Sequence, residues 1–442
     1  MKICCLDRTK DRISYLPDPL RCHIVSFLPL EDLIRTSILS RQWEFVCSSL
    51  SQLEFNQFVF EKKRSKKGGF RDFVDEMIFP KSSDESISSR HVNAWISFAI
   101  QHNVQDLDLH SVKIGKLPHR LFTCNMLMKL GLESVEVEWP LILKFPRLKS
   151  LKLDNVKFNG NTVQRLLSSC TFTVLEELSV IFCGLNVSTL SISIPTLKYL
   201  EFFDENDTTI SVSISTLQEM YWGCCNPPNI IFEDLSALSR AMFDLYQNFD
   251  SYDIAIYSEV KYATKILVGL CNVVKLILRN RFLELLSVDQ DLSTCLSSSN
   301  ISNLKRLDLE FCPTSVHFQV ITHLLGSYRN LQNVHICVVD LEERAIFLET
   351  DDVEESCKLK ELPLGDVLNC LKIVKIVDFK GSQIELELVR YLFKNAKYLE
   401  KLDISYIKSR AQPNAAEQKR INEVLSTFTR VSPSVSVTLS IS

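Results

Sequence analysis

Cysteine and histidine are the residue types that could support catalysis or metal binding, but neither shows the spacing that such chemistry requires. The chain has 15 cysteines and 8 histidines in 442 residues. No two cysteines stand in C-x-x-C spacing, and the adjacent pairs Cys4–Cys5 and Cys224–Cys225 have poor geometry for a disulfide or a zinc site. The histidines are scattered, and no nucleophile elbow, P-loop or H-E-x-x-H motif occurs. We therefore expect a chain without a cofactor or metal, not an enzyme, with reduced thiols in the cytoplasm and/or nucleus.

Apolar side chains are concentrated near the N-terminus, and the chemistry that they predict is docking. Residues 16–43 read "LPDPLRCHIVSFLPLEDLIRTSILSRQW" and hold about a dozen large apolar side chains. Short helices cannot enclose so many, and each one left in water costs about 1.5–3 kcal/mol. Such a surface predicts a protein partner. The alternative is that this segment caps the rest of the chain.

Three short helices are expected to position these apolar residues. We predict that Asp18 caps a first helix starting at Pro19, because a missing N–H costs nothing there. Its apolar face would be Leu20, Ile24, Phe27 and Leu28, and Pro29 would end it. A second helix is predicted over 31–38. Ser40 would cap a third helix, whose shared face comprises Trp43, Val46, Cys47 and Leu50.

A six-residue pattern with apolar residues at positions 1, 4 and 6 recurs along the rest of the chain. Copies begin at 104 ("VQDLDL"), 127, 148, 175, 197, 217, 273, 304 ("LKRLDL"), 331, 371 and 399. The first six are spaced 20 to 27 residues apart, the period expected of leucine-rich repeats. Each copy predicts a short strand that shares a core with its neighbours in a stacked solenoid. The gaps at 217–273 and 331–371 are expected to hold insertions or degenerate repeats, with a strand and then a helix near 259–269 in the first.

Smaller features fit this register. Cys183, Cys225 and Cys312 fall at position 9 of their repeats, where we expect them to pack as small buried groups rather than bind metal. Residues 91–102 are predicted to form a helix that caps the first repeat. The basic run "EKKRSKKGG" at 61–69 favours an exposed loop, with a nuclear-import signal or an anionic partner as the alternative. The acidic cluster at 349–355 favours a solvated loop, with a basic partner as the alternative.

Charge and hydropathy exclude two further classes of partner. The formal net charge is −4, which does not favour a polyanion, so we expect no nucleic acid. The first residues lack the apolar core of a signal peptide, and the longest uncharged stretch is interrupted by serines and Pro195. We therefore expect no membrane partner.

The N-terminal segment "DRISYLPDPLRCHIVSFLPLEDLIRTSILSRQWEFV" resembles the F-box, the helical module that docks a Skp-type adaptor. The matching features are Leu16–Pro17, "IVSFLP", "RTSILS" and the tryptophan that follows. Their order is similar to that of plant F-box/leucine-rich-repeat proteins, and "CLKIVKIVDFKGSQIELELVRYLFKNAKYLEKLDI" resembles the FBD region that ends many of them. Two positions depart from the pattern: Leu30 stands where a Ser or Thr cap is common, and Gln42 where a second basic residue is common.

The resemblance implies an α/β chain in which a short three-helix F-box precedes an irregular leucine-rich-repeat solenoid of parallel strands backed by helices and loops. It implies five parts: an F-box-like module at 11–55, a basic loop and capping helix at 56–102, repeats at 103–345, an acidic loop at 346–368, and an FBD-like region with terminal repeats at 369–442. The residues expected to contact the adaptor or to support that interface are Leu16, Pro17, Leu20, Ile24, Leu28, Leu33, Leu39 and Trp43.

The function that the resemblance implies is recruitment of a protein substrate to a Skp-cullin-F-box ubiquitin ligase. The F-box would join the adaptor and through it a cullin, while the repeats hold a substrate whose identity and binding residues the sequence leaves open. Two alternatives remain. One is a small-molecule co-receptor, for which Lys152, Trp222 and Arg306 are sparse candidates on the repeat face. The other is an F-box scaffold that acts outside a ligase.

Overall fold

The structure is a computed structural model that divides into two compact units, Met1–Val187 and Ser188–Ser442. The residues that it describes are 13, 16–28, 36, 43, 46, 52–56, 96–97, 99–100, 103–110, 117–135, 137, 139–140, 143–158, 162–168, 171–185, 187–204, 208–224, 230–245, 263, 266–280, 282–288, 303–339, 368–406 and 415–441.

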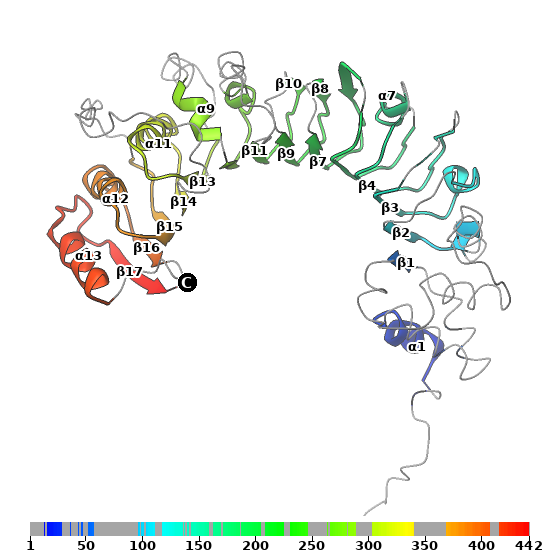
Figure 1. The fold of residues 1–442 in the computed structure, drawn as a ribbon, viewed down its shortest axis with the longest axis horizontal. Helices are drawn as coiled ribbons and strands as arrows, with labels where there is room; N and C mark the ends of the chain where they lie inside the picture. Colours follow the sequence, from blue (N-terminus) through cyan, green and yellow to red (C-terminus); the bar gives the residue numbers. More distant parts are fainter. Residues whose placement is uncertain are drawn as a thin grey trace, which may run out of the picture. The chain divides into compact units, whose positions relative to one another are not determined.

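The first unit contains a parallel sheet preceded by a short helix (Figure 1). Its elements are α1 (Asp18–Val25), β1 (Gln52–Asn56), β2 (Asp106–His110), the 3-10 helix η1 (Leu121–Thr123), β3 (Lys129–Glu133), β4 (Ser150–Asp154), α7 (Thr162–Leu166) and β5 (Glu177–Ile181). The strands pair in chain order from β1 to β5. Equivalent repeat positions face each other across the sheet, with Leu107 opposite Leu130 and Leu130 opposite Leu151. The sheet register is thus the register of the sequence repeat.

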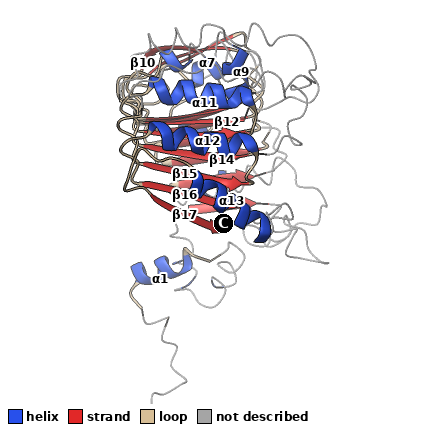
Figure 2. Ribbon diagram, turned by 90° about the vertical axis from the view of Figure 1, so that its left-hand side faces the viewer, coloured by secondary structure: helices blue, strands red, loops and turns tan. Residues whose placement is uncertain are grey.

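The second unit has a longer parallel sheet with helices on one side (Figure 2). Its main strands, in spatial order, are β7 (Tyr199–Asp204), β9 (Glu219–Cys224), β11 (Arg240–Leu245), β12 (Lys275–Asn280), β13 (Arg306–Phe311), β14 (Asn333–Val338), β15 (Ile373–Phe379), β16 (Lys401–Tyr406) and β17 (Ser436–Ile441). The helices are α9 (Phe282–Val288), α11 (Ser315–Ser327), α12 (Gln383–Asn395) and α13 (Ala415–Thr427). All four lie on the same side of the main strands (Figure 1).

A second parallel sheet of three strands replaces helices in part of this unit. It consists of β6 (Thr189–Ile192), β8 (Thr209–Ser213) and β10 (Ile230–Asp234), in the order β10-β8-β6. Each of these strands precedes a main strand in the chain, and they lie on the same side of the main sheet as α9 (Figure 1). The alternation of buried Leu190, Ile192, Ile210 and Val212 with exposed or half-buried neighbours explains why strands form here.

Positions 1, 4 and 6 of the sequence repeat form the core, as predicted. In all eleven copies these side chains are at most 3 % exposed, from Val104, Leu107 and Leu109 in the first to Leu399, Leu402 and Ile404 in the last. Because side chains alternate along a strand, the residues between them point to the opposite, open side of the sheet. The predicted fold class, an α/β chain with parallel strands backed by helices, is confirmed.

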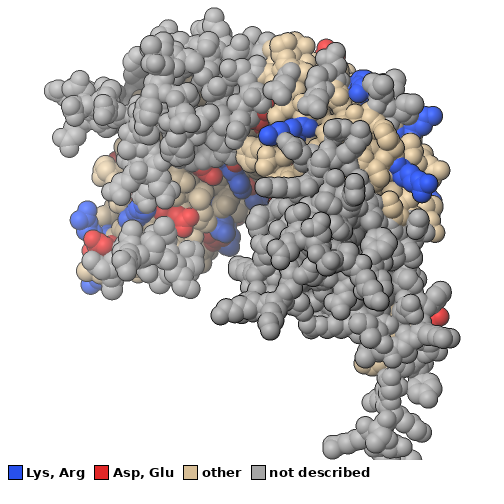
Figure 3. Space-filling model, turned by 45° about the vertical axis from the view of Figure 1, so that its right-hand side comes forward, with Lys and Arg blue, Asp and Glu red and all other residues tan. Residues whose placement is uncertain are grey.

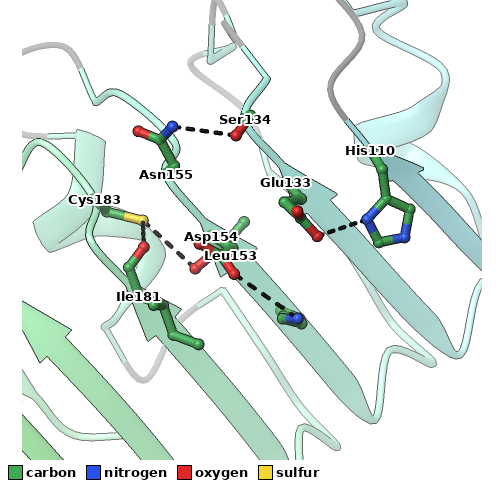
Figure 4. Close-up of polar contacts among 9 residues, drawn as sticks. His110, Glu133, Ser134, Leu153, Asp154, Asn155, Ile181 and Cys183 are labelled. Atoms are coloured by element: carbon green, nitrogen blue, oxygen red, sulfur yellow. Dashed lines mark hydrogen bonds and ion pairs between the residues drawn. The ribbon is translucent and has the colours of Figure 1, made fainter. Parts of the chain in front are cut away.

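A left-handed turn closes several repeats immediately after the strand. Ser134, Asn155 and Phe182, each at position 8, have φ angles of 54°, 51° and 47°. The Ser134 N–H donates to the Asp154 carbonyl over 2.8 Å, and the Asn155 N–H to that of Ile181 over 2.8 Å. In Figure 4 the same strand ends carry side-chain contacts, including Asn155 Nδ2 to Ser134 Oγ at 3.1 Å and His110 Nδ1 to Glu133 Oε2 at 2.6 Å.

The turn directs the next side chain, at position 9, back into the core. Cys183 is 2 % exposed, and its thiol lies 3.5 Å from the Leu153 carbonyl oxygen and 3.4 Å from that of Ile181 (Figure 4). Cys312 is 1 % exposed. Packing is therefore confirmed as the role of these two cysteines, and Cys225 lies outside the described residues.

The insertion regions differ in part from expectation. The gap after 217 begins with another repeat strand, β11, whose Ala241 and Phe243 are buried. The sequence pattern missed this strand because a small alanine, Ala241, stands at position 4, where the other copies have a larger apolar residue. The predicted helix is present at 263 and 266–268. The basic run at 61–69 and the acidic cluster at 349–355 lie outside the described residues. Of the predicted capping helix at 91–102, residues 96–97 and 99–100 are helical, and Ile96 and Ala99 are buried.

The turn into α12 is specified by its own residues. Ser382 caps the helix, accepting from the Glu385 N–H, while the Glu385 carboxylate accepts from the backbone N–H groups of Ser382 at 2.6 Å and Lys380 at 2.9 Å. Gly381 precedes the cap with φ of 82°, and a Cβ there would overlap the Ile421 side chain of α13. Glycine is required for both reasons.

Gly381→Ala is expected to lower the free energy of unfolding by about 1–3 kcal/mol, through backbone strain and overlap with Ile421. Gly184→Ala is the matched control, because the nearest atom to its new Cβ would be Lys157 Cγ at 3.9 Å. The control should be neutral or more stable by about 0.4–1 kcal/mol. Urea denaturation of both variants measures the difference, and equal effects would contradict the role assigned to Gly381.

Candidate docking surfaces

Helix α1 starts one residue earlier and ends sooner than predicted. Pro17, not Asp18, is the N-cap, and no side chain caps the helix, so the predicted Asp18 cap is wrong. The backbone at Pro17 is extended, and Asp18 and Pro19 already adopt helical geometry, which leaves the Asp18 carboxylate free to pair with Arg21. The helix ends at Val25, where Ser26 donates its hydroxyl to the His23 carbonyl at 2.8 Å. The prediction that Pro29 ends the helix is therefore wrong, because residues 26–28 already form a turn.

The outer side of this segment carries an apolar surface, defined as Leu20, Ile24, Phe27 and Leu28 and called here the α1 apolar surface. The four side chains are 51 %, 42 %, 74 % and 37 % exposed, respectively. The Phe27 ring packs edge-on against His23, with ring centroids 4.9 Å apart. Exposure of four large apolar side chains within nine residues is unfavourable in water. The surface is therefore available to a partner.

The inner side of α1 holds the helix against the residues that follow. Val25, Trp43 and Val46 form a small buried cluster, and Cys22 packs against it. The buried Arg21 guanidinium lies 5.7 Å from the Trp43 ring centroid, within cation–π range. Trp43 is only 6 % exposed, so it supports α1 from inside.

The structure separates the eight residues expected at an adaptor interface into three groups. Pro17, Leu20, Ile24 and Leu28 are exposed, Leu16 is half-buried and Trp43 is buried. Leu33 and Leu39 lie outside the described residues. Phe27 is the most exposed of the apolar residues, but it was not among the eight. Its position on the predicted helical face was the signal that could have included it.

Trp43→Ala is expected to destabilise the α1 region by about 3–5 kcal/mol, because it removes the largest side chain of a buried cluster. Phe27→Ala should change its stability by less than about 0.5 kcal/mol, because the ring is mostly in water. Amide hydrogen exchange of residues 18–28 in the full-length variants measures both. Equal protection in the two variants would show that Trp43 does not hold the helix.

A second candidate surface lies on the open side of strands β12 to β15. The residues that point away from the core at the third strand position are Ile277, Asp308, His335 and Lys375, aligned across the four strands. The first strand position adds Lys275 and Arg306. Adjacent strands are about 4.8 Å apart, so these side chains are neighbours. Figure 3 shows Lys, Arg, Asp and Glu side chains intermixed over the C-terminal part of the second unit.

We call Lys275, Arg306, His335 and Lys375, together with the central Asp308, the basic cluster. Asp308 is only 12 % exposed and pairs with Arg306 Nε at 2.8 Å and Lys275 Nζ at 3.3 Å. Two cations, Arg306 and Lys275, therefore share one carboxylate. His335 Nε2 is buried and makes no hydrogen bond in the part of the chain that the structure describes.

The environment of His335 favours its neutral form. Burial of the imidazole lowers its pKa, and the positive charges of Lys375, Arg306 and Lys275 act in the same direction, whereas the Asp308 carboxylate opposes them. As pH falls below the ordinary value of 6.5, the unfolded chain takes up this proton before the folded chain does. The stability associated with neutral His335 is therefore lost on acidification through the lowered pKa.

The pKa of His335 is expected to respond to its two charged neighbours in opposite directions. Asp308→Asn removes the charge that opposes the shift and should lower the pKa further, whereas Lys375→Met should raise it towards 6.5. NMR titration of the histidine ring protons in wild type and both variants measures the midpoints. Identical midpoints would show that these side chains do not act on the imidazole.

The residues considered for a small-molecule pocket do not form one. Trp222 is 1 % exposed and stacks on Phe202 inside the core, with ring centroids 4.6 Å apart. The side chains of Lys152 and Arg306 are 48 % and 47 % exposed. Each pairs with a carboxylate, Lys152 with Asp154 at 3.9 Å and Arg306 with Asp308 at 2.8 Å. Because Trp222 faces the core, it cannot join Arg306 in an aromatic and basic pocket.

Neither a metal site nor a membrane-spanning helix occurs among the residues that the structure describes. No group of three His, Cys, Asp or Glu side chains is arranged to hold a metal ion. None of the described helices combines the length and the apolar character needed to cross a membrane.

Burial raises the pKa of the Cys337 thiol to about 11, so this thiol is protonated at neutral pH.

Comparison with known proteins matches three parts of the chain to family models. Residues 13–54 match the F-box domain, 92–243 match the LRR repeats of the FBD-associated F-box protein At5g56370, and 366–404 match the FBD. The first match contains the α1 apolar surface, and the last contains β15, α12 and the start of β16.

Relatives of similar length occur in Arabidopsis thaliana. The F-box/LRR-repeat protein At4g14096 is 26% identical, with 96% of this chain and 93% of the relative aligned. The F-box/LRR-repeat protein At3g59250 is 28% identical over 90% of both chains. The FBD-associated F-box protein At5g38590 is 25% identical over 94% of this chain and 98% of the relative. With its F-box, repeats and FBD in this order, the chain belongs to the plant F-box/leucine-rich-repeat proteins that carry a C-terminal FBD.

Proposed function

We propose that the chain is the substrate-recruiting subunit of a Skp-cullin-F-box ubiquitin ligase in the cytoplasm or nucleus. The α1 apolar surface docks a Skp-type adaptor, the adaptor joins a cullin, and the leucine-rich repeats bind a protein substrate. The chain itself contributes no catalytic group. It raises the concentration of substrate lysines near an activated ubiquitin.

The observation that carries this proposal is the α1 apolar surface within the segment that matches an F-box. The helix has one side buried by Val25 and its cluster and the other side open, which is the arrangement of a docking element rather than of a core helix. The buried Arg21 and Trp43 fix the orientation of the exposed side. If the adaptor covers these four exposed side chains, each of them would contribute up to about 1.5–3 kcal/mol to the binding free energy.

The repeats supply the other half of the proposed function. Their core positions are filled, so the fold needs no ligand to complete it. Their open side presents polar and charged side chains on successive parallel strands, a broad surface suited to a protein rather than to a small molecule. The buried position of Trp222 also favours a protein substrate over a small-molecule co-receptor.

Leu20→Asp combined with Ile24→Asp is expected to weaken adaptor binding by more than about 100-fold, since two apolar contacts worth about 1.5–3 kcal/mol each are lost. Both positions are exposed, so the chain should still fold. Isothermal titration calorimetry with a purified Skp-type adaptor measures the affinity, and circular dichroism measures the fold.

The matched control is Ile231→Asp combined with Val431→Asp, two apolar side chains outside the F-box that are each 46 % exposed. This variant should bind the adaptor like wild type. Unchanged adaptor affinity in the Leu20/Ile24 variant would overturn the docking assignment. Copurification of a cullin with the wild-type complex then separates a ligase subunit from a scaffold that acts without one.

A further inference from the structure

We propose that the basic cluster on β12 to β15 binds an acidic side chain, aspartate or glutamate, in an extended segment of the substrate protein. This inference rests on the proposed function in that it takes the repeats to be the substrate-binding part. It adds the place on the repeats and the chemical class of the recognised group.

The charges of the basic cluster are not balanced within the described part of the chain. Lys275 and Arg306 both pair with Asp308, so one carboxylate serves two cations. Lys375 is exposed on β15 and forms no ion pair within 4.0 Å among the described residues; the carboxylate opposite it in register, Asp403 of β16, pairs with Lys401. The cluster therefore carries an excess of two positive charges when His335 is neutral. A carboxylate from a partner would reduce this excess.

Neighbouring strands do not share this excess, which makes the cluster a discrete site. On β16, Lys401 pairs with Asp403 at 2.6 Å. On β9 and β11, Glu219 pairs with Arg240 at 3.1 Å. These strands are close to neutral on the open side. The uncompensated charge is therefore confined to β12–β15.

The acids around the cluster favour a single acidic side chain over a polyanion. Glu310 follows Asp308 by two residues on the same side of β13, and its carboxylate lies 4.0 Å from Arg279 Nε. A nucleic acid lying across these strands would meet Glu310 and Asp403 as well as the cations, and like charges repel. A peptide can place one carboxylate on the cluster and uncharged residues elsewhere.

Apolar side chains next to the cluster fit the rest of such a peptide. Ile373 starts β15 beside the cluster and is 40 % exposed, and half-buried Ile277 lies opposite Asp308 in register. An extended segment that crosses parallel strands about 4.8 Å apart can place an acidic residue on Lys375 and Arg306 and an apolar residue on Ile373. The recognised feature is therefore an acidic residue close to an apolar one.

Selection of random peptides tests this inference without a known substrate. The full-length chain in complex with a Skp-type adaptor is immobilised through the adaptor and used to select from a displayed random peptide library. Peptides selected by wild type are expected to be enriched in Asp or Glu beside an apolar residue. Arg306→Glu combined with Lys375→Glu should weaken binding of a selected peptide by about tenfold or more, and a repeat selection on this variant should favour Lys or Arg.

The control reverses two charges on the helix side of the same unit. Lys419→Glu combined with Arg420→Glu changes exposed residues of α13 and the same net charge, and its selected peptides should match those of wild type. Lack of acidic enrichment on wild type, or an unchanged preference in the Arg306/Lys375 variant, would overturn the proposal. Tighter binding of a selected peptide with phosphoserine in place of its acidic residue would overturn the choice of a carboxylate. Adaptor binding by α1 is measured separately, so failure here leaves the proposed F-box role standing.

Discussion

The structure depends on burial of three side chains from each repeat, two of them on its short strand, against the corresponding three of the next repeat. One such strand cannot remove its apolar side chains from water alone, because its neighbours in sequence point the opposite way. Parallel pairing in register brings equivalent repeat positions together, as in the contact of Leu107 with Leu130 and of Leu130 with Leu151. The left-handed turn after the strand adds position 9 to the same core. The other side of this core is covered by different elements along the chain: by helices, by the three-stranded second sheet and by the helix of the FBD.

The sequence was sufficient for those parts of the fold that repeat. Eleven copies of one pattern indicated which side chains are buried, and the structure agrees at every one. It was insufficient where the pattern weakens. Ala241 and Phe243 of β11 are buried because the neighbouring strands β9 and β12 cover them. The three strands of the second sheet bury their apolar side chains only once the main sheet is formed next to them. Helix ends were also misjudged, since Asp18 pairs with Arg21 rather than capping.

The candidate surfaces show the same division. The apolar face of α1 could be inferred from the spacing of Leu20, Ile24 and Phe27, because helical geometry alone places them together. The inward position of Trp43 depends on contacts with Val25 and Val46 that spacing does not specify. The basic cluster could not be inferred, because Lys275, Arg306 and Lys375 come from three different repeats. Only the pairing of β12 through β15 makes them neighbours.

The strict alternation of side chains along each strand has an evolutionary consequence. Substitutions at outward positions remove few contacts and usually change stability by less than about 0.5 kcal/mol, whereas those at inward positions create cavities. A lineage can therefore exchange the residues on the open side repeatedly while the scaffold persists. Relatives that align over nine-tenths of this chain share only 25% to 28% of its residues. Gene duplication followed by drift on that side would generate receptors with new targets at little structural risk.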